Sequence, residues 1–228
     1  MSESKIVTRH EFHQRYWSYY LLLEKDFLQT ERYLAIDELN FSAFSNEYIK
    51  QYQTICSEID VIAKSYCKEM ESKFKGSTIN TYCKCIVDNN GDFVSRTVDL
   101  KNKGIKLKPW ENWTYSVETQ KDGKPKIVSC NPAWWKTYNS IKHSRTTTNK
   151  ETGLPYYKFA NQGNILQALA ALFQLELYYY RLLRQNHFPT EPDMPGPASK
   201  IFEVENWNNL WVMTAENIGF LKAKGDAK

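Results

Sequence analysis

The residues best suited to chemistry lie in a basic segment that runs from Trp134 to Arg145. Between Gly123 and Lys150 the sequence has no acidic residue, and the cationic residues and one histidine there are Lys124, Lys126, Lys136, Lys142, His143, Arg145 and Lys150. Cationic side chains contact phosphates and aromatic rings stack on bases, so this composition predicts contact with nucleic acid. A solvated basic face whose aromatic rings point into the core is an equally good interpretation.

A helix over this segment would gather its polar residues on one side. Trp135, Asn139 and His143 follow one another at steps of four, which places them on a common helical face. Another set is apolar and suited to burial, namely Trp134, Tyr138 and Ile141. We therefore expect His143, Asn139 and Lys136 as catalytic groups, and Lys142, Arg145, Trp135 and Lys150 as nucleic-acid-binding groups.

The chemistry that these residue types favour is cleavage of RNA. A histidine beside a scissile phosphate can take the proton of the ribose 2′-hydroxyl or give one to the leaving oxygen, while a cation such as Lys136 stabilises the developing negative charge. This scheme requires no metal, so we expect no cofactor. The alternative is that His143 only caps the helix or forms a local hydrogen bond.

A second pair of residues has a related spacing. Arg181 and His187 are separated by five residues near the end of a predicted long helix. They are an alternative catalytic pair, although Pro189 follows closely and ordinary helix termination explains their position equally simply.

Composition restricts the class of protein. The 228 residues are 42% hydrophobic and include 15 Tyr, 11 Phe and 7 Trp, which indicates a folded chain and not a disordered one. A formal net charge of +4 is weak evidence for nucleic-acid binding by itself. The sequence has no P-loop, no GxGxxG motif and no serine nucleophile elbow, so nucleotide hydrolysis and dinucleotide redox chemistry are disfavoured.

The sequence also bears on the cellular compartment. The first residues are polar and show no export signal. An apolar run from Ile165 to Leu183 contains Gln167, Glu176 and Arg181, so it predicts a buried helix and no membrane span. Five cysteines are an odd number without a zinc-type spacing, which favours reduced thiols in the cytoplasm.

Apolar periodicity predicts four principal helices. A capping box at Thr8 and Glu11 opens a helix that should run from near Arg9 to near Glu38. The others should run from Ser45 to Gly76, from Asn131 to Arg145 with Asn131 as its cap, and from Asn161 to about residue 188.

Residues 78–130 have a different pattern, which predicts a small β-rich insertion between the second and third helices. Strands are expected on both sides of a turn at Asn89–Asp92, with Cys83 and Cys85 on the first of them, and a hairpin is expected around Asp122-Gly123. A further strand is expected at Ile201–Val204. We thus predict a mainly α chain, a helical bundle forming a single domain over residues 1–228, with a C-terminal extension at 189–228.

Three segments resemble the HEPN superfamily: Tyr-Tyr-Leu-Leu-Leu-Glu at 19–24, Ser-Glu-Ile-Asp-Val-Ile at 57–62, and residues 134–145 just before a long apolar helix. The resemblance implies a helical bundle, often dimeric, and a metal-independent ribonuclease of prokaryotic toxin–antitoxin or antiviral systems. The family places an Arg about four to six residues before a His near the last long helix.

In this chain His143 matches that histidine, and the upstream base whose spacing comes closest to the pattern is Lys136, with six residues between them. Lysine lacks the planar two-pronged grip of guanidinium on phosphate. The resemblance implies RNA as ligand, a homodimer, and an antitoxin or another protein as partner. The alternative is a non-catalytic HEPN-like module for protein interaction or dimerisation.

Overall fold

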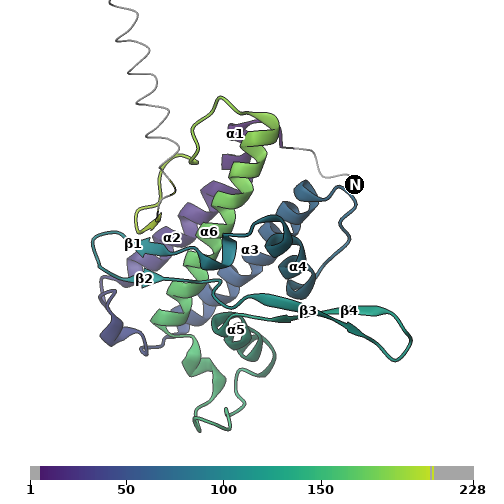
Figure 1. Ribbon diagram of the computed structural model, residues 1–228. Helices are drawn as coiled ribbons and strands as arrows, with labels where there is room; N and C mark the ends of the chain where they lie inside the picture. Colours follow the sequence, from purple (N-terminus) through teal and green to yellow (C-terminus); the bar gives the residue numbers. More distant parts are fainter. Residues whose placement is uncertain (1–5, 206, 208–228) are drawn as a thin grey trace, which may run out of the picture.

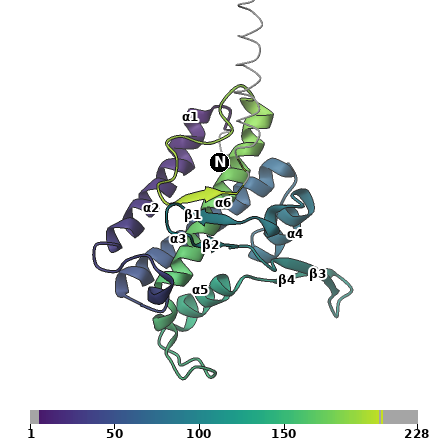
Figure 2. The same cartoon turned by 60° about the vertical axis from the view of Figure 1, so that its left-hand side comes forward.

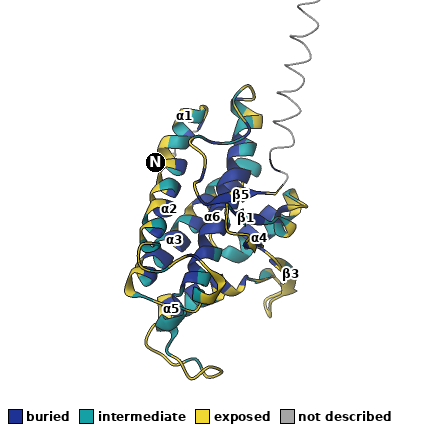
Figure 3. Ribbon diagram, turned by 90° about the vertical axis from the view of Figure 1, so that its left-hand side faces the viewer, coloured by how far each residue is buried: buried dark blue, intermediate teal, exposed yellow. Residues whose placement is uncertain are grey.

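The long helix α6 (Gln162–His187) lies at the centre of the fold, which we describe from a computed structural model over residues 6–205 and residue 207. Asn161 caps α6, its side chain accepting a hydrogen bond from the backbone N–H of Asn164. Every residue from Ala168 to Tyr180 is buried, and in Figure 3 most of this helix is coloured as buried. The prediction of a buried central helix is therefore confirmed.

Helix α3 (Asn46–Met70) packs along α6, as predicted, but ends earlier than expected. Ser45 caps its start by accepting from the backbone N–H of Tyr48. The end near Gly76 was wrong: Glu71 is extended, with φ −128° and ψ 98°, and the chain turns there. The ring of Phe74 packs 6.1 Å from that of Tyr82, and this contact holds the chain away from a continued helix.

The N-terminal helical segment is shorter than the predicted one and changes its winding along the way. It consists of α1 (Arg9–Phe12), a π-helical stretch (His13–Trp17) and α2 (Ser18–Thr30). The predicted capping box at Thr8 is present. A π-helical turn returns to the same side after about five residues, so Phe12 and Trp17 can both be buried.

The expectation that this helix continues to Glu38 was wrong. The hydroxyl group of Thr30 donates to the carbonyl oxygen of Phe27, and a turn begins there that buries Ile36.

Helix α4 (Ile79–Asn89) replaces the first strand of the predicted β-rich insertion. Thr78 and Thr81 form a capping box, and the buried positions recur at helical spacing: Tyr82, Cys83, Cys85 and Ile86. The residues Asn89–Asp92 therefore end a helix and do not form a hairpin turn. Cys83 and Cys85 accordingly lie on a helix. A hydrogen bond with the Cys85 thiol, together with burial, raises the pKa of Cys67 on α3.

A three-stranded antiparallel sheet joins the middle of the chain to the C-terminal end of the described residues. Strand β1 (Val98–Leu100) lies between β2 (Lys106–Leu107) and β5 (Phe202–Val204), with Val98 opposite both Leu107 and Val204. The strand predicted at Ile201–Val204 is thereby confirmed. It brings the C-terminal segment back beside β1, as Figure 2 shows, while residues 208–228 of the predicted extension lie outside the described residues.

The predicted hairpin around Asp122-Gly123 is also confirmed. Strands β3 (Thr114–Thr119) and β4 (Pro125–Cys130) are paired, and Gly123 takes a φ of 81°, which a residue with a side chain rarely adopts. The hairpin extends away from the helices in Figure 1, and Cys130 at its end is exposed. The molecule is thus mainly helical, with small antiparallel sheets between α4 and α5 (Ala133–Ser144).

Within the described chain, none of the helices combines the length and the hydropathy that crossing a bilayer requires. The predicted absence of a span at 165–183 rests on the polar residues of α6, of which Gln174 and Glu176 are fully buried in the protein core.

Candidate functional site

One side of α5 fixes the basic helix to the core. The indole nitrogen of Trp134 donates to the carbonyl oxygen of Pro109 at 2.6 Å, and the hydroxyl group of Tyr52 donates to the carbonyl oxygen of Trp134. The ring of Tyr138 lies 6.2 Å from that of Tyr52. The predicted burial of Trp134, Tyr138 and Ile141 is therefore confirmed.

The start of α5 differs from the prediction by one residue. Pro132 occupies the cap position without a side-chain hydrogen bond, and the helix begins at Ala133. Asn131, the predicted cap, instead accepts from the indole of Trp113 at 3.2 Å and from the hydroxyl group of Ser129 at 2.6 Å. Its side chain thus joins the start of α5 to the base of the hairpin.

The opposite side of α5 carries the predicted catalytic groups. Lys136 and His143 are exposed, and Asn139 between them is half-buried. Steps of three and four residues place these side chains on successive turns of one helical face. In the described part of the chain, no side-chain hydrogen bond or ion pair engages the imidazole of His143. The face therefore combines two free polar groups with a cation.

Trp135 does not lie on that exposed face, contrary to its predicted role in nucleic-acid binding. Its side chain is 6% exposed, and its ring lies 5.7 Å from Trp134 and 5.2 Å from Tyr138. The expectation from the four-residue spacing was wrong, because Trp135 stands at the border of the buried side and packs against the rings there. Stacking of this ring on a base would require it to leave the core.

Lys142 lies at the edge between the two sides of α5. Its ammonium group is 5.7 Å from the centre of the Tyr138 ring. Burial raises the pKa of Asp60 on α3, and the positive charges of Lys64 and Lys142 oppose that rise. Part of the positive charge of Lys142 is therefore balanced by Asp60, which leaves Lys136 and Arg145 as the less compensated cations of the segment.

Arg145 adjoins a groove between α5 and the beginning of α3. The groove encloses about 370 Å³ and is lined by Asn46, Ile49, Lys50, Gln53, Thr54 and Arg145. Lys150 lies farther along, in an exposed turn beyond the paired residues Thr148 and Pro155. The groove thus has a cation on each wall, Lys50 and Arg145, close to the end of α5.

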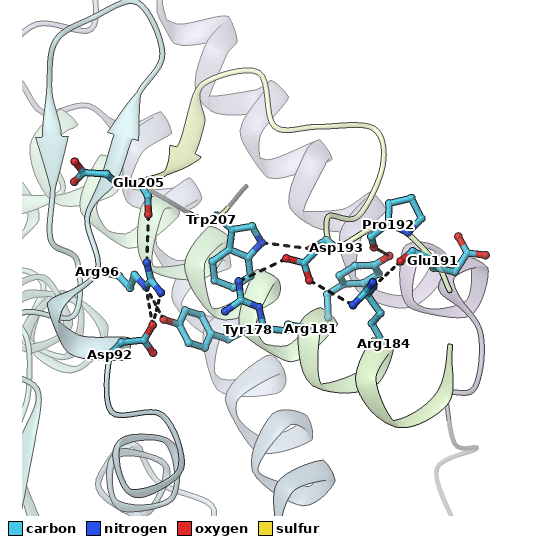
Figure 4. A network of polar contacts seen from close by, with 11 residues as sticks. Asp92, Arg96, Tyr178, Arg181, Arg184, Glu191, Pro192, Asp193, Glu205 and Trp207 are labelled. Atoms are coloured by element: carbon cyan, nitrogen blue, oxygen red, sulfur yellow. Dashed lines mark hydrogen bonds and ion pairs between the residues drawn. The ribbon is translucent and has the colours of Figure 1, made fainter. Parts of the chain in front are cut away.

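The alternative pair, Arg181 and His187, is engaged elsewhere. Six residues along a helix put two side chains roughly 120° apart around its axis, so the pair does not share a face. The indole of Trp207 lies over the Arg181 guanidinium, 3.3 Å from it, as Figure 4 shows. The imidazole of His187 lies 2.9 Å from a carboxylate oxygen of Glu69 on α3.

The surroundings of Arg181 belong to a network that closes the C-terminal segment onto α6. Asp193 lies 3.7 Å from Arg181 and 3.8 Å from Arg184, and its backbone oxygen accepts from the Trp207 indole. Tyr180 donates its hydroxyl hydrogen to the carbonyl oxygen of Pro192. These contacts, drawn in Figure 4, favour a structural role for the Arg181 end of the helix.

A second cavity was missed by the sequence analysis. It encloses about 460 Å³ between the end of α2 and the first turns of α3, and we call it the α2–α3 cavity. It is lined by Asp26, Gln29, Thr30, Tyr33, Leu34, Phe44, Ser45, Glu47, Tyr48 and Lys50. No motif marks it, because two separate stretches, residues 26–34 and 44–50, form it together; the one available signal was the pair of aromatic residues, Tyr33 and Phe44, in a polar turn region.

Over residues 6–205, no group of three or more histidine, cysteine, aspartate or glutamate side chains is arranged to hold a metal ion.

The structure is therefore that of a mainly helical protein in which a cationic, histidine-bearing helix lies beside a surface groove. No protein-family model matches the chain, and comparisons with curated proteins and with solved structures also found no match.

Proposed function

We propose that this chain is an RNA-binding protein of the HEPN-like type that acts through the outward face of α5. The observation that carries the proposal is the accessibility of Lys136, His143 and Arg145 on a segment without acidic residues, next to a groove. Phosphate contacts by such cations supply most of the sequence-independent affinity for nucleic acid. The mainly helical fold supports the proposal, since the HEPN resemblance implies a helical bundle.

The same face supports metal-independent cleavage of RNA. His143 would move a proton between the ribose 2′-hydroxyl group, or the leaving oxygen, and solvent. Lys136, about two turns earlier on the same face, would stabilise the negative charge that develops on the phosphate, and Asn139 would hold a phosphate or ribose oxygen by hydrogen bonding. Because the His143 imidazole is free in the described chain, it is available to substrate.

A non-catalytic HEPN-like interaction module is the second candidate. It is favoured by the surroundings of His143, because within the described chain no carboxylate or carbonyl group holds the imidazole in a fixed orientation, as a catalytic histidine usually requires. Lysine at position 136 also gives a weaker grip on phosphate than arginine. In that case the basic face would dock a protein partner, such as an antitoxin, or a second copy of the chain.

The family resemblance supports the biological setting that we propose, a prokaryotic defence or toxin–antitoxin system in the cytoplasm. It also supports a homodimer.

The decisive experiment is incubation of the purified protein with labelled single-stranded RNA in the presence of EDTA. We expect cleavage by the unmodified chain and a rate at least about a hundredfold lower for His143→Ala, since general acid–base groups contribute that much or more. Lys136→Arg should keep or raise the rate, because guanidinium binds phosphate through two parallel hydrogen bonds.

The matched control is His10→Ala, because His10 is exposed on α1, outside α5 and its groove. It should cleave like the unmodified chain. Equal cleavage by His143→Ala would show that another nuclease is responsible and would contradict the enzymatic proposal. Binding of RNA without cleavage would support the RNA-binding role and contradict the catalytic one, and neither binding nor cleavage would favour the interaction module.

A further inference from the structure

Two aromatic rings at the α2–α3 cavity are left in contact with water. Tyr33 is 91% exposed and Phe44 is 45% exposed, and both line the cavity. The ammonium group of Lys158 lies 5.6 Å from the Phe44 ring, and the ring of Tyr157 meets it edge-on at 5.9 Å. Rings that are accessible and flanked by cations are the platforms on which unpaired bases stack.

The polar groups of the cavity suit the edge of a base better than a phosphate. The carboxylate of Glu47 is already engaged, by Lys50 at 2.8 Å and by the amide of Gln51 at 3.0 Å, and these hydrogen bonds lower its pKa. The carboxylate of Asp26 has no side-chain hydrogen bond to any of the described residues. It can therefore accept from an N–H group, such as the exocyclic amino group of adenine or cytosine.

The α2–α3 cavity and the groove at the end of α5 share a lining residue. Lys50 lines both this cavity and the groove that contains Arg145. A strand whose phosphates lie against Arg145 and α5 would reach the cavity across the first turns of α3. Lys50 is paired with Glu47, which leaves Lys158 beside Phe44 and Arg145 in the groove as cations against the single carboxylate of Asp26.

We propose that the α2–α3 cavity binds an unpaired base with an exocyclic amino group, belonging to the RNA strand whose phosphates lie on α5. Tyr33 and Phe44 stack on the base, and Asp26 accepts its amino group. The inference rests on the proposed function and specifies its substrate as single-stranded RNA. A duplex is a poor ligand, because its bases must first leave the stack.

The test is fluorescence anisotropy with labelled ten-nucleotide RNAs of adenine, cytosine or uracil, and with a duplex as competitor. We expect the adenine and cytosine strands to bind more tightly than the uracil strand, and the duplex to compete poorly. Tyr33→Ala should weaken binding of the adenine strand by roughly five- to a hundredfold, the loss expected for one base stack. Asp26→Ala, which removes the acceptor oxygens, should reduce the preference over uracil.

The matched control is Leu39→Ala, which removes another apolar side chain that is 91% exposed but does not line the cavity. The Leu39→Ala variant should bind RNA like the unmodified chain. Both Leu39→Ala and Tyr33→Ala should have the same circular dichroism spectrum as the unmodified chain. If Arg145→Ala weakens binding while Tyr33→Ala leaves it unchanged, the inference about the cavity is overturned and the proposed function stands. If no RNA binds at all, both are overturned.

Discussion

Replacing Glu24 by alanine should lower the free energy of unfolding by about 3–5 kcal/mol, since each orphaned buried donor costs about 1–3 kcal/mol. The Glu24 side chain is 1% exposed on α2. It accepts hydrogen bonds from the hydroxyl groups of Tyr20 and Ser199, and from the backbone N–H groups of Lys200 and Ile201. One carboxyl group thus ties the returning C-terminal segment to α2 just before β5.

Urea unfolding monitored by circular dichroism would measure this loss. Lys25→Ala, at the exposed neighbouring position, is the matched control and should stay within about 0.5 kcal/mol of the unmodified chain. Glu24→Gln keeps an acceptor oxygen and should fall between the two. A loss of less than about 1 kcal/mol for Glu24→Ala would contradict the anchoring role.

Replacing Glu176 by methionine should have the opposite effect and raise the free energy of unfolding by about 1–3 kcal/mol. Glu176 is fully buried in α6, and within the described chain neither carboxyl oxygen has a hydrogen-bond partner. Burial raises its pKa well above the usual value, and the neighbouring Glu58 on α3 adds to the rise. An apolar side chain of similar size removes this unsatisfied polar group.

The same residues make the stability depend on pH. Burial raises the pKa of Glu58 from 4.5 to about 7. A group whose pKa is higher in the folded state contributes its full stability below its unfolded pKa, and this contribution is lost as the pH rises through the folded pKa. The free energy of unfolding should therefore fall between about pH 4.5 and pH 7 and continue to fall above it.

Thermal unfolding at a series of pH values would measure both effects. Glu176→Gln is the matched comparison, because it removes the ionisable group but keeps the buried polar one. We expect the glutamine variant to flatten the pH dependence above pH 7 without the full gain of methionine. A methionine variant that melts below the unmodified chain throughout this range would refute the account.

Local patterns were sufficient to predict helices whose caps and apolar period agree. Ser45 and Asn161 cap α3 and α6 as their sequences indicate, and the buried positions of α5 follow from the spacing of Trp134, Tyr138 and Ile141. These features depend on neighbours within four residues along the chain. The hairpin at Gly123 was equally local, because its turn residues fix the pairing.

Features that depend on distant contacts were not predicted. Tyr82 and Ile86 lie four residues apart, as a helix requires, yet the turn-forming residues after them suggested a strand. The segment is a helix because its apolar face is buried against α3. Trp135 was placed on the wrong side of α5, because its burial depends on rings held in place by Tyr52 of α3. The α2–α3 cavity exists only when residues 26–34 and 44–50 are packed beside each other.

The exposed thiol at the end of β4 offers a single site for attaching a fluorescent label to this protein. All five cysteines lie in the described chain, and Cys130 alone is exposed, while the other four are buried. Buried thiols react slowly, so a maleimide dye under native conditions should attach to a single position. Energy transfer between that dye and a labelled oligonucleotide would then report the direction in which a bound strand runs across the molecule.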